Sequence, residues 1–233
     1  MGTYIRTLTV YTDMEILPQE IPAFRGAVLH ALGDQANILF HNHSGENTFR
    51  YSYPLIQYKR LNRKAAIVCV EEAVDLIGQL LTNLSDTIMI GSREVEWHTN
   101  RIQPARLLVQ TWDTSFPYHI NHWLPLNTHN YNLYKNTEGV VERVALLENI
   151  LKANLLSMLK GLNIHLEQEL ILKITQISDS HLIKNKGVKM MAFNADFNCN
   201  LSIPNNLGIG KNASIGYGII HQEKTQKTET KDS

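Results

Sequence analysis

The sequence lacks the features that mark secreted and membrane proteins. Its 233 residues include only two cysteines, Cys69 and Cys199, which are too few for a disulfide framework. No apolar run approaches the ~20 residues that a membrane-spanning helix needs. The first residues, Met1 to Arg6, do not have the layout of a signal peptide. We therefore expect a cytoplasmic protein with no membrane partner.

A surplus of charge of either sign is also absent, since 22 lysines and arginines balance 22 aspartates and glutamates. The content of 43% hydrophobic and 19% charged residues is ordinary for a folded chain and excludes a disordered one. Basic residues nevertheless outnumber acidic ones in residues 44–64 and again in residues 181–221. A neutral chain can in this way still present a basic face to an anionic partner.

Four glycines form the most informative motif of the chain. They stand in two Gly-x-Gly pairs, Gly208-Ile209-Gly210 and Gly216-Tyr217-Gly218, around a polar spacer that holds Lys211 and Ser214. Glycine has no Cβ, so such a loop can adopt positive φ and bring its backbone N–H groups against a bulky anion. We interpret the motif as a loop that binds the phosphate backbone of RNA. The alternative is a glycine-rich hairpin turn without a ligand.

The two commoner phosphate-binding loops do not fit this motif. A P-loop requires serine or threonine directly after Gly-Lys and then a helix, whereas Lys211 is followed by Asn212 and by an expected strand. A dinucleotide-binding fingerprint opens a helix within an N-terminal βαβ unit, whereas this motif lies close to a polar C-terminal segment.

The first half of the chain alternates regularly between strand and helix patterns. Pro22 suits the first turn of a helix that ends before Gly33-Asp34, and Ser44 to Asn47 form a turn cluster between two strand-like runs. We expect strands over residues 4–12, 37–43, 50–61, 64–70 and 87–102, with helices over 22–32 and 71–81. This is the β-α-β-β-α-β order of a ferredoxin-like domain with one added strand.

The second half begins in the same way and then departs from the repeat. We expect strands over 105–111, 170–177, 187–197, 200–203 and 215–221, a loop-rich stretch over 112–136 and one long helix over 141–162, without a clear second helix. The sequence therefore predicts an α+β protein with two ferredoxin-like domains, the second partly degenerate. The predicted units are residues 1–103, residues 104–221 and a disordered tail over 222–233.

Two histidines form the sharpest candidate for catalysis. His41 and His43 lie two residues apart on an expected strand, so both side chains point to one face, ~6.6 Å apart. Across the turn, Tyr51, Tyr53 and Lys59 share one strand face. Because an imidazole with a pKa near ~6.5 is available in both protonation states, this set could break a phosphodiester by acid–base catalysis without a metal.

Other interpretations of the histidines stay open at this point. His-x-His on a strand is also a metal-ligand arrangement, and the pair could simply be two exposed polar residues on a hairpin. A second group, His119, His122 and His129, surrounds Trp123 within the expected loop. It gives only a weak zinc signal, and stacking of RNA bases on the aromatic side chain is an alternative.

Several segments together resemble a known family. Ile21 to Gly26, Phe40 to His43, Phe49 to Lys59 and the spacing of the two glycine pairs are similar to the b-type branch of the sixth family of CRISPR-associated proteins. Members of that family are endoribonucleases that cut repeat precursor RNA into guides. The resemblance covers most of residues 3–70 and 204–220.

The resemblance implies cleavage that needs no metal or other cofactor and that leaves 2′,3′-cyclic phosphate and 5′-hydroxyl ends. It also implies that His41 and His43 share the acid–base work, with Tyr51 or Tyr53 nearby and Lys59 as an electrostatic helper. The expected partner is CRISPR repeat RNA, with interference-complex proteins or a second copy of the chain as further candidates. The expected RNA contacts are Gly208, Gly210, Lys211, Ser214, Gly216, Gly218, Arg60, Lys186 and Lys189.

Two other functions remain as alternatives. The first is a non-catalytic RNA-binding subunit of an interference complex, because the glycine loop occurs in many proteins of the same superfamily. The second is a metal-dependent enzyme that uses His41 and His43 as ligands.

Overall fold

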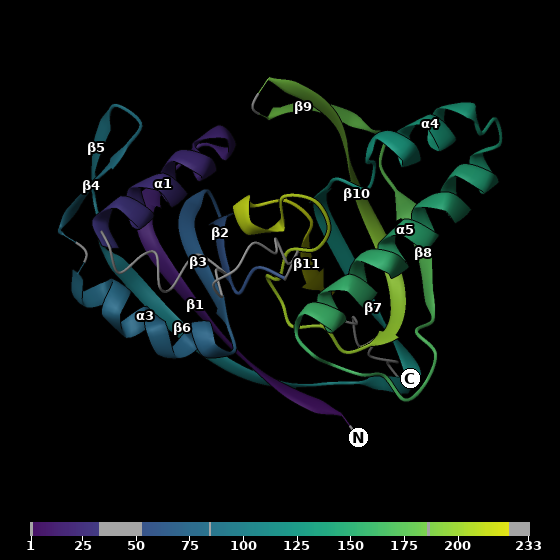
Figure 1. Cartoon of the computed structure of the whole chain (residues 1–233), viewed down its shortest axis with the longest axis horizontal. Helices are drawn as coiled ribbons and strands as arrows, with labels where there is room; N and C mark the ends of the chain where they lie inside the picture. Colours follow the sequence, from purple (N-terminus) through teal and green to yellow (C-terminus); the bar gives the residue numbers. More distant parts are fainter. Residues whose placement is uncertain (1, 33–52, 84, 186, 224–233) are drawn as a thin grey trace, which may run out of the picture.

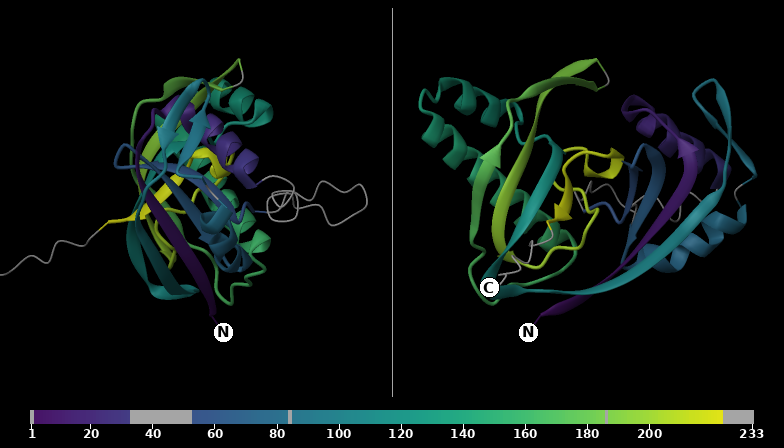
Figure 2. Two further views of the ribbon diagram at one scale, coloured as in Figure 1. Left: turned by 90° about the vertical axis from the view of Figure 1, so that its left-hand side faces the viewer. Right: turned by 180° about the vertical axis from the view of Figure 1, so that it is seen from behind.

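The computed structural model describes residues 2–32, 53–83, 85–185 and 187–223. Two α+β halves lie side by side, and the segment that contains the four glycines lies between them (Figures 1 and 2). This is the α+β fold of two ferredoxin-like units that the sequence predicts. The described part of the chain contains no helix that is both long and apolar enough to cross a membrane.

The first half is a four-stranded antiparallel sheet covered on one face by helices. Along the chain it comprises β1 (Thr3–Glu15), α1 (Ile21–Leu32), β2 (Ile56–Leu61), β3 (Lys64–Val70), α3 (Glu72–Asn83) and β6 (Thr99–Val109), and the strand order is β2-β3-β1-β6. A short 3₁₀ turn, η1 (Pro18–Glu20), precedes α1. Val10 and Ile67 of the sheet are buried in one core with Phe24 and Val28 of α1 and Ile77 of α3.

The expected single strand over residues 87–102 is instead a hairpin followed by the start of β6. Strands β4 (Thr87–Ile90) and β5 (Arg93–Glu96) pair with one another, and Gly91 in the turn between them has a φ of 63°. The hairpin packs against α1, and Trp97 stacks on Phe24 with 5.9 Å between ring centroids. The turn escaped prediction because its neighbours alternate in the way that a single strand would.

The boundary predicted between residues 103 and 104 falls inside a strand of the first sheet. Strand β6 runs through that boundary and pairs with β1, Pro104 lying opposite Leu8. Proline is tolerated here because β6 is an edge strand. Only Gln110 separates β6 from the first strand of the second sheet, β7 (Thr111–Trp123).

The second half repeats the strand order of the first. Its sheet runs β11-β7-β10-β8, built from β7, β8 (Leu172–Ile177), β10 (Val188–Leu201) and β11 (Ile219–Gln222), while β9 (His181–Asn185) pairs with β10 as a projecting hairpin (Figure 1). The long helix α5 (Val140–Gly161) buries Leu147, Leu151 and Leu155 against this sheet. Between β10 and β11 there is only a 3₁₀ turn, η2 (Ala213–Ile215), so the second copy lacks its second helix as expected.

The prediction of a loop-rich stretch over residues 112–136 was wrong. The stretch contains β7 and a helix, α4 (Thr128–Asn136), whose N-cap Asn127 accepts a hydrogen bond from the Asn130 N–H. In β7 the side chains of Tyr118 and Ile120 are buried, while His119 and Asn121 alternate with them. Asparagine and proline have low strand propensity, and together with the polar histidines they concealed this period-two pattern.

Candidate functional site

The segment from Leu207 to Gly218, which we call the glycine loop, is held in place by side chains of the other half of the molecule. The Gly208 N–H donates to Gln57 Oε1 at 2.8 Å, and the Tyr53 hydroxyl donates to the Gly208 carbonyl at 3.0 Å. Lys59 Nζ donates to the Ala213 carbonyl at 2.9 Å. All three side chains are buried. Gln57 and Lys59 belong to β2, so the edge strand of the first sheet supports the loop of the second half.

Glycine is required at all four positions by the protein's own packing and backbone geometry. Gly210, Gly216 and Gly218 have φ values of 75°, 88° and 62°, which L side chains rarely adopt. A Cβ on Gly218 would overlap the Ile209 carbonyl oxygen, and one on Gly216 would lie 2.6 Å from Ile21 Cδ1. A Cβ on Gly208 would overlap Lys59 Nζ.

The structure divides the six expected RNA contacts of the loop into two groups. Gly208, Gly216 and Gly218 are buried, and the N–H groups of Gly208 and Gly218 are bonded within the protein, that of Gly218 to the His122 carbonyl at 3.2 Å. Gly210 and Lys211 are exposed and Ser214 is half-buried. The outer part of the loop is therefore the part that a ligand can reach.

Tyr53 and Lys59 lie beneath the loop and not on its open side. Lys59 is completely buried, and this burial lowers the pKa of its ammonium group to about 7. Burial also raises the pKa of Tyr53 well above its ordinary value, which keeps the hydroxyl protonated as a donor. Their geometry therefore suits support of the loop backbone. His41, His43 and Tyr51 lie outside the described residues, which resume at Tyr53.

The remaining expected contacts are scattered. Arg60 is half-buried and its Nε donates to the Ile16 carbonyl at 2.6 Å. Lys189 is exposed on β10 directly opposite Lys184 of β9. Like charges directly opposite are unfavourable in a sheet, and an anionic ligand would relieve that repulsion. Lys186 lies outside the described residues.

A groove of about 650 Å³ runs beside the glycine loop and was not predicted from the sequence. Gly210 and Lys211 stand at the loop side, Tyr53 and Pro54 come from the first half, and α5 forms a long wall. The wall exposes polar or small side chains at a spacing of four residues, namely Asn149, Ala153 and Ser157. This row of residues is visible in the sequence, but it indicates a groove only once the glycine loop is known to lie beside α5.

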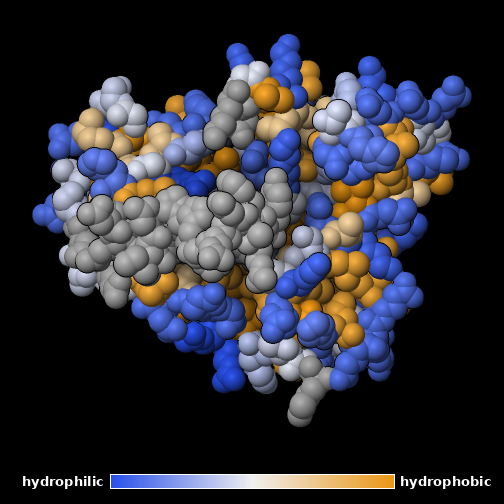
Figure 3. Space-filling model, in the orientation of Figure 1, coloured by the Kyte–Doolittle hydropathy of each residue, from blue (hydrophilic) through white to orange (hydrophobic). Residues whose placement is uncertain are grey.

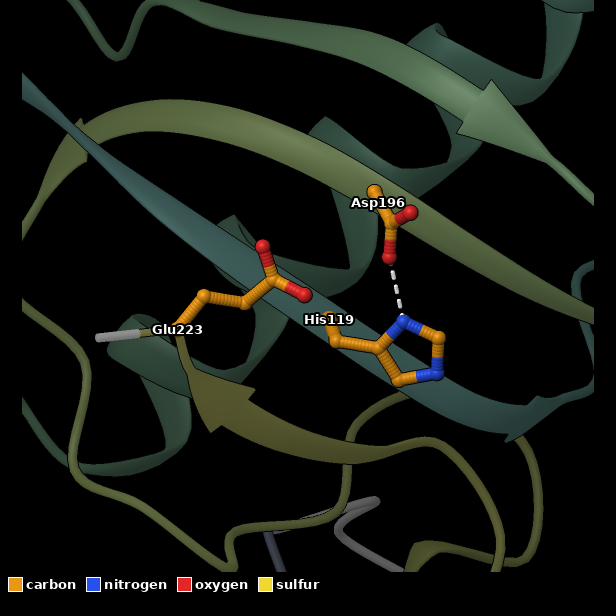
Figure 4. Close-up of side chains that lie close together, drawn as sticks. All are labelled: His119, Asp196 and Glu223. Carbon is orange, nitrogen blue, oxygen red and sulfur yellow. Dashed lines mark hydrogen bonds and ion pairs between the residues drawn. The ribbon is translucent and has the colours of Figure 1, made fainter. Parts of the chain in front are cut away.

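A second cluster lies on the sheet of the second half (Figure 4). His119 and Asp196 face each other across β7 and β10, and His119 Nδ1 is hydrogen-bonded to Asp196 Oδ1. His119 Nε2 lies 3.0 Å from Asn121 Oδ1, and a carboxylate oxygen of Glu223 approaches the same ring. The three potential ligand atoms lie within 4.8 Å of one another. A metal ion could use this spacing, but both ring nitrogens already have hydrogen-bond partners.

Two further histidines meet at the base of the projecting hairpin. His122 Nδ1 lies 3.3 Å from His181 Nε2, with the two rings perpendicular. Burial first, and then the nearby His181 and Arg60, lower the pKa of His122. A lowered pKa keeps the His122 ring neutral near pH 7, and the contact between the two rings joins β9 to β7.

Comparison with known proteins identifies the family. The model of the Cas6b N-terminal domain matches residues 3–107, and that of the Cas6b C-terminal domain matches residues 110–223. An uncharacterized protein of Methanocaldococcus jannaschii is 39% identical over 101 residues, which are 43% of this chain and 67% of that protein.

Solved structures agree in fold over almost the whole chain. A crystal structure of Cas6b superposes with a TM-score of 0.85 at 24% identity, covering 95% of this chain and all of the other. A CRISPR RNA processing endoribonuclease Cas6b superposes with a TM-score of 0.71 at 22% identity, and Csf5, a type IV Cas6 crRNA endonuclease, with 0.58 at 11%; both have the same coverage. Because the two domain models together span residues 3–223, this chain belongs to the Cas6b family.

Proposed function

We propose that the protein is an endoribonuclease that cuts CRISPR repeat precursor RNA without a metal ion. The observation that carries the proposal is the glycine loop, which the first half of the molecule holds directly above Tyr53. Membership of the Cas6b family supports the same substrate. The catalytic residues in this proposal are His41 and His43, which the sequence predicts and which lie outside the described residues.

The proposed reaction is an attack by the ribose 2′-hydroxyl on the adjacent phosphorus. One neutral histidine of the His41–His43 pair accepts the 2′-hydroxyl proton as the O2′–P bond forms. The protonated partner gives a proton to the 5′-oxygen as the P–O5′ bond breaks. The products are a 2′,3′-cyclic phosphate and a 5′-hydroxyl end. Hydrogen-bond donors at the outer part of the loop would stabilise the charge that develops on the phosphoryl oxygens.

Lys59 and Tyr53 have a positioning role in this proposal. Both donate to carbonyl groups of the glycine loop and both are buried. They act on the RNA through the loop that they hold and need not touch the phosphate. Lys211, which is exposed at the tip of the loop, is the cation that can reach a phosphate directly.

The test uses a labelled repeat RNA from the same genome, incubated with the protein in excess EDTA. A matched RNA carries a single 2′-deoxy nucleotide at the cleavage position. We expect cutting of the first RNA only. His43→Ala should lower the cleavage rate by about 10²–10⁴-fold with little loss of binding, while His98→Ala, which removes an exposed histidine paired with Glu96, should leave the rate unchanged.

Three results would contradict the proposal in different ways. Unchanged cleavage by the His41→Ala/His43→Ala double variant would remove the catalytic assignment. Tight binding without any cutting would favour a non-catalytic RNA-binding subunit. Loss of cutting in EDTA, restored by a divalent metal, would favour a metal-dependent enzyme.

A further inference from the structure

We infer that the groove between α5 and the glycine loop binds an unpaired nucleotide of the repeat RNA and that Asn149 reads the edge of its base. This inference rests on the proposed function, because it takes repeat RNA as the ligand. It adds a specificity-determining position on α5, in a part of the chain that carries none of the predicted site residues.

The size and neighbours of the groove fit a nucleotide. Its volume of about 650 Å³ lies within the ~300–1,000 Å³ of ordinary small-ligand pockets. Gly210 and Lys211 line the same groove, so a phosphate bound at the exposed tip of the loop would place the attached nucleoside beside α5. Figure 3 shows hydrophobic surface between hydrophilic side chains over α5. The apolar residues Pro125 and Leu146 line the groove itself beside its amide side chains, so a base would find both an apolar face and polar edges.

The chemistry of the wall fits a base better than a phosphate. Among the described residues that line the groove, none is acidic and Lys211 is the single cation. Four asparagines line it instead: Asn127, Asn130, Asn149 and Asn154. A side-chain amide offers a donor and an acceptor side by side, which matches the adjacent donor and acceptor on the edge of a base such as adenine.

Two of the four amides are already engaged and two are free to read a base. Asn154 Oδ1 accepts from the Trp123 indole N–H at 2.9 Å, and Asn127 Oδ1 caps α4 by accepting from the Asn130 N–H at 2.8 Å. The side-chain amides of Asn149 and Asn130 have no hydrogen-bond partner among the described residues. Asn149 is exposed and stands one helical turn from Ala153, whose small side chain leaves the centre of the wall open.

The experiment measures binding of a repeat RNA that carries the 2′-deoxy substitution, so that no cleavage intervenes. The RNA is compared with a set in which one nucleotide at a time is abasic. Wild-type protein should lose about tenfold in affinity at one or two positions, as expected for one lost base contact. Asn149→Ala should bind the unmodified RNA about tenfold more weakly and show no further loss with the abasic nucleotide at that position.

Two variants complete the design. Ala153→Leu keeps the amide and fills the centre of the groove, so it should weaken binding at the same RNA position. Asn132→Ala removes an exposed asparagine of α4 that does not line the groove and should change nothing. Both asparagine replacements favour the helix, so loss of folding cannot produce the result.

Each outcome decides the inference. An unchanged affinity for Asn149→Ala would overturn it while leaving the proposed function intact. A uniform loss across all RNAs, with the position dependence of wild type preserved, would make Asn149 a backbone contact and also overturn it. Failure of the wild-type protein to bind repeat RNA would remove the proposed function and the inference together.

Discussion

The two halves of the molecule share one strand order and differ in what fills the interval before their last strand. In the first half, α3 and the β4–β5 hairpin lie between β3 and β6; in the second, the equivalent interval between β10 and β11 holds η2 and the glycine loop. The sequence presented the missing helix and the glycine loop as separate features. The structure shows that they occupy the same place in the repeat, so the departure from the repeat is the candidate site.

The difference also explains why the loop depends on the first half. A helix satisfies its own backbone groups, apart from those at its ends, whereas a loop of this kind must find partners elsewhere. Tyr53, Gln57 and Lys59 supply three of them. At this position the first half has a helix whose backbone hydrogen bonds lie mostly within it. The second half has a loop whose backbone is hydrogen-bonded by side chains of the first half.

The largest effect that distinguishes the two intervals should come from Gly218→Ala. Its φ of 62° disfavours any side chain, and a Cβ would overlap a backbone oxygen that cannot move freely. We expect the free energy of unfolding to fall by at least about 2–3 kcal/mol, with RNA affinity reduced as well. Urea denaturation measures the first effect. A loss below about 0.5 kcal/mol would show that the loop adapts and is not held as described.

Lys59→Met should change how the free energy of unfolding depends on pH, which tests the buried lysine that supports the loop. The pKa of Lys59 falls from its ordinary value of 10.5 to about 7 in the folded state. Between those values the unfolded chain binds a proton that the folded protein does not, so the free energy of unfolding should rise with pH. The slope for one such proton is about 1.4 kcal/mol per pH unit. We expect wild type to show this contribution between pH 7.5 and 8.5 and Lys59→Met to lose it.

The comparison of slopes needs a control lysine. Lys160 is exposed near the end of α5, so Lys160→Met should leave the pH dependence of unfolding unchanged. Equal slopes for wild type and Lys59→Met, measured by urea denaturation at each pH, would show that folding does not lower the pKa of Lys59 to about 7.

The smallest change in the free energy of unfolding should come from a glycine substitution in α3, which lies in the equivalent interval of the first half. Gly78 lies inside α3, and a Cβ there would meet nothing within 4 Å. Gly78→Ala should therefore raise the free energy of unfolding by about 0.5–1 kcal/mol, because alanine favours the helix over glycine. Thermal or urea denaturation checks the sign. Destabilisation here would mean that the two intervals do not differ in the way that their glycines indicate.

Much of the fold could be predicted from the sequence because its strongest patterns are local. The strand at residues 64–70 has the predicted bounds, and α5 begins and ends one residue from the predicted helix. Strand β7 was missed because its exposed positions carry histidine, asparagine and proline, which obscured the buried Tyr118 and Ile120. The predicted boundary falls inside β6, because Pro104 resembles a break in the sequence although an edge strand tolerates it.

The site was less predictable because it depends on distant contacts. Local sequence identified Tyr53 and Lys59, but nothing near them indicates that residues about 150 positions away cover them. The groove escaped prediction for the same reason, since it forms where α5, Tyr53 and Lys211 meet. His41 and His43 fall outside the described residues, so their catalytic role stays a prediction.

The three bonds that hold the glycine loop also constrain the order of folding. They join residues separated by 151, 154 and 155 positions in sequence, so their formation requires closure of very long loops. Contacts of such high sequence separation form late. During synthesis, the contact between Lys59 and Ala213 cannot form until Ala213 has emerged from the ribosome. We therefore expect affinity for RNA to appear only when both sheets have folded and docked, which protects a half-made molecule from capturing RNA.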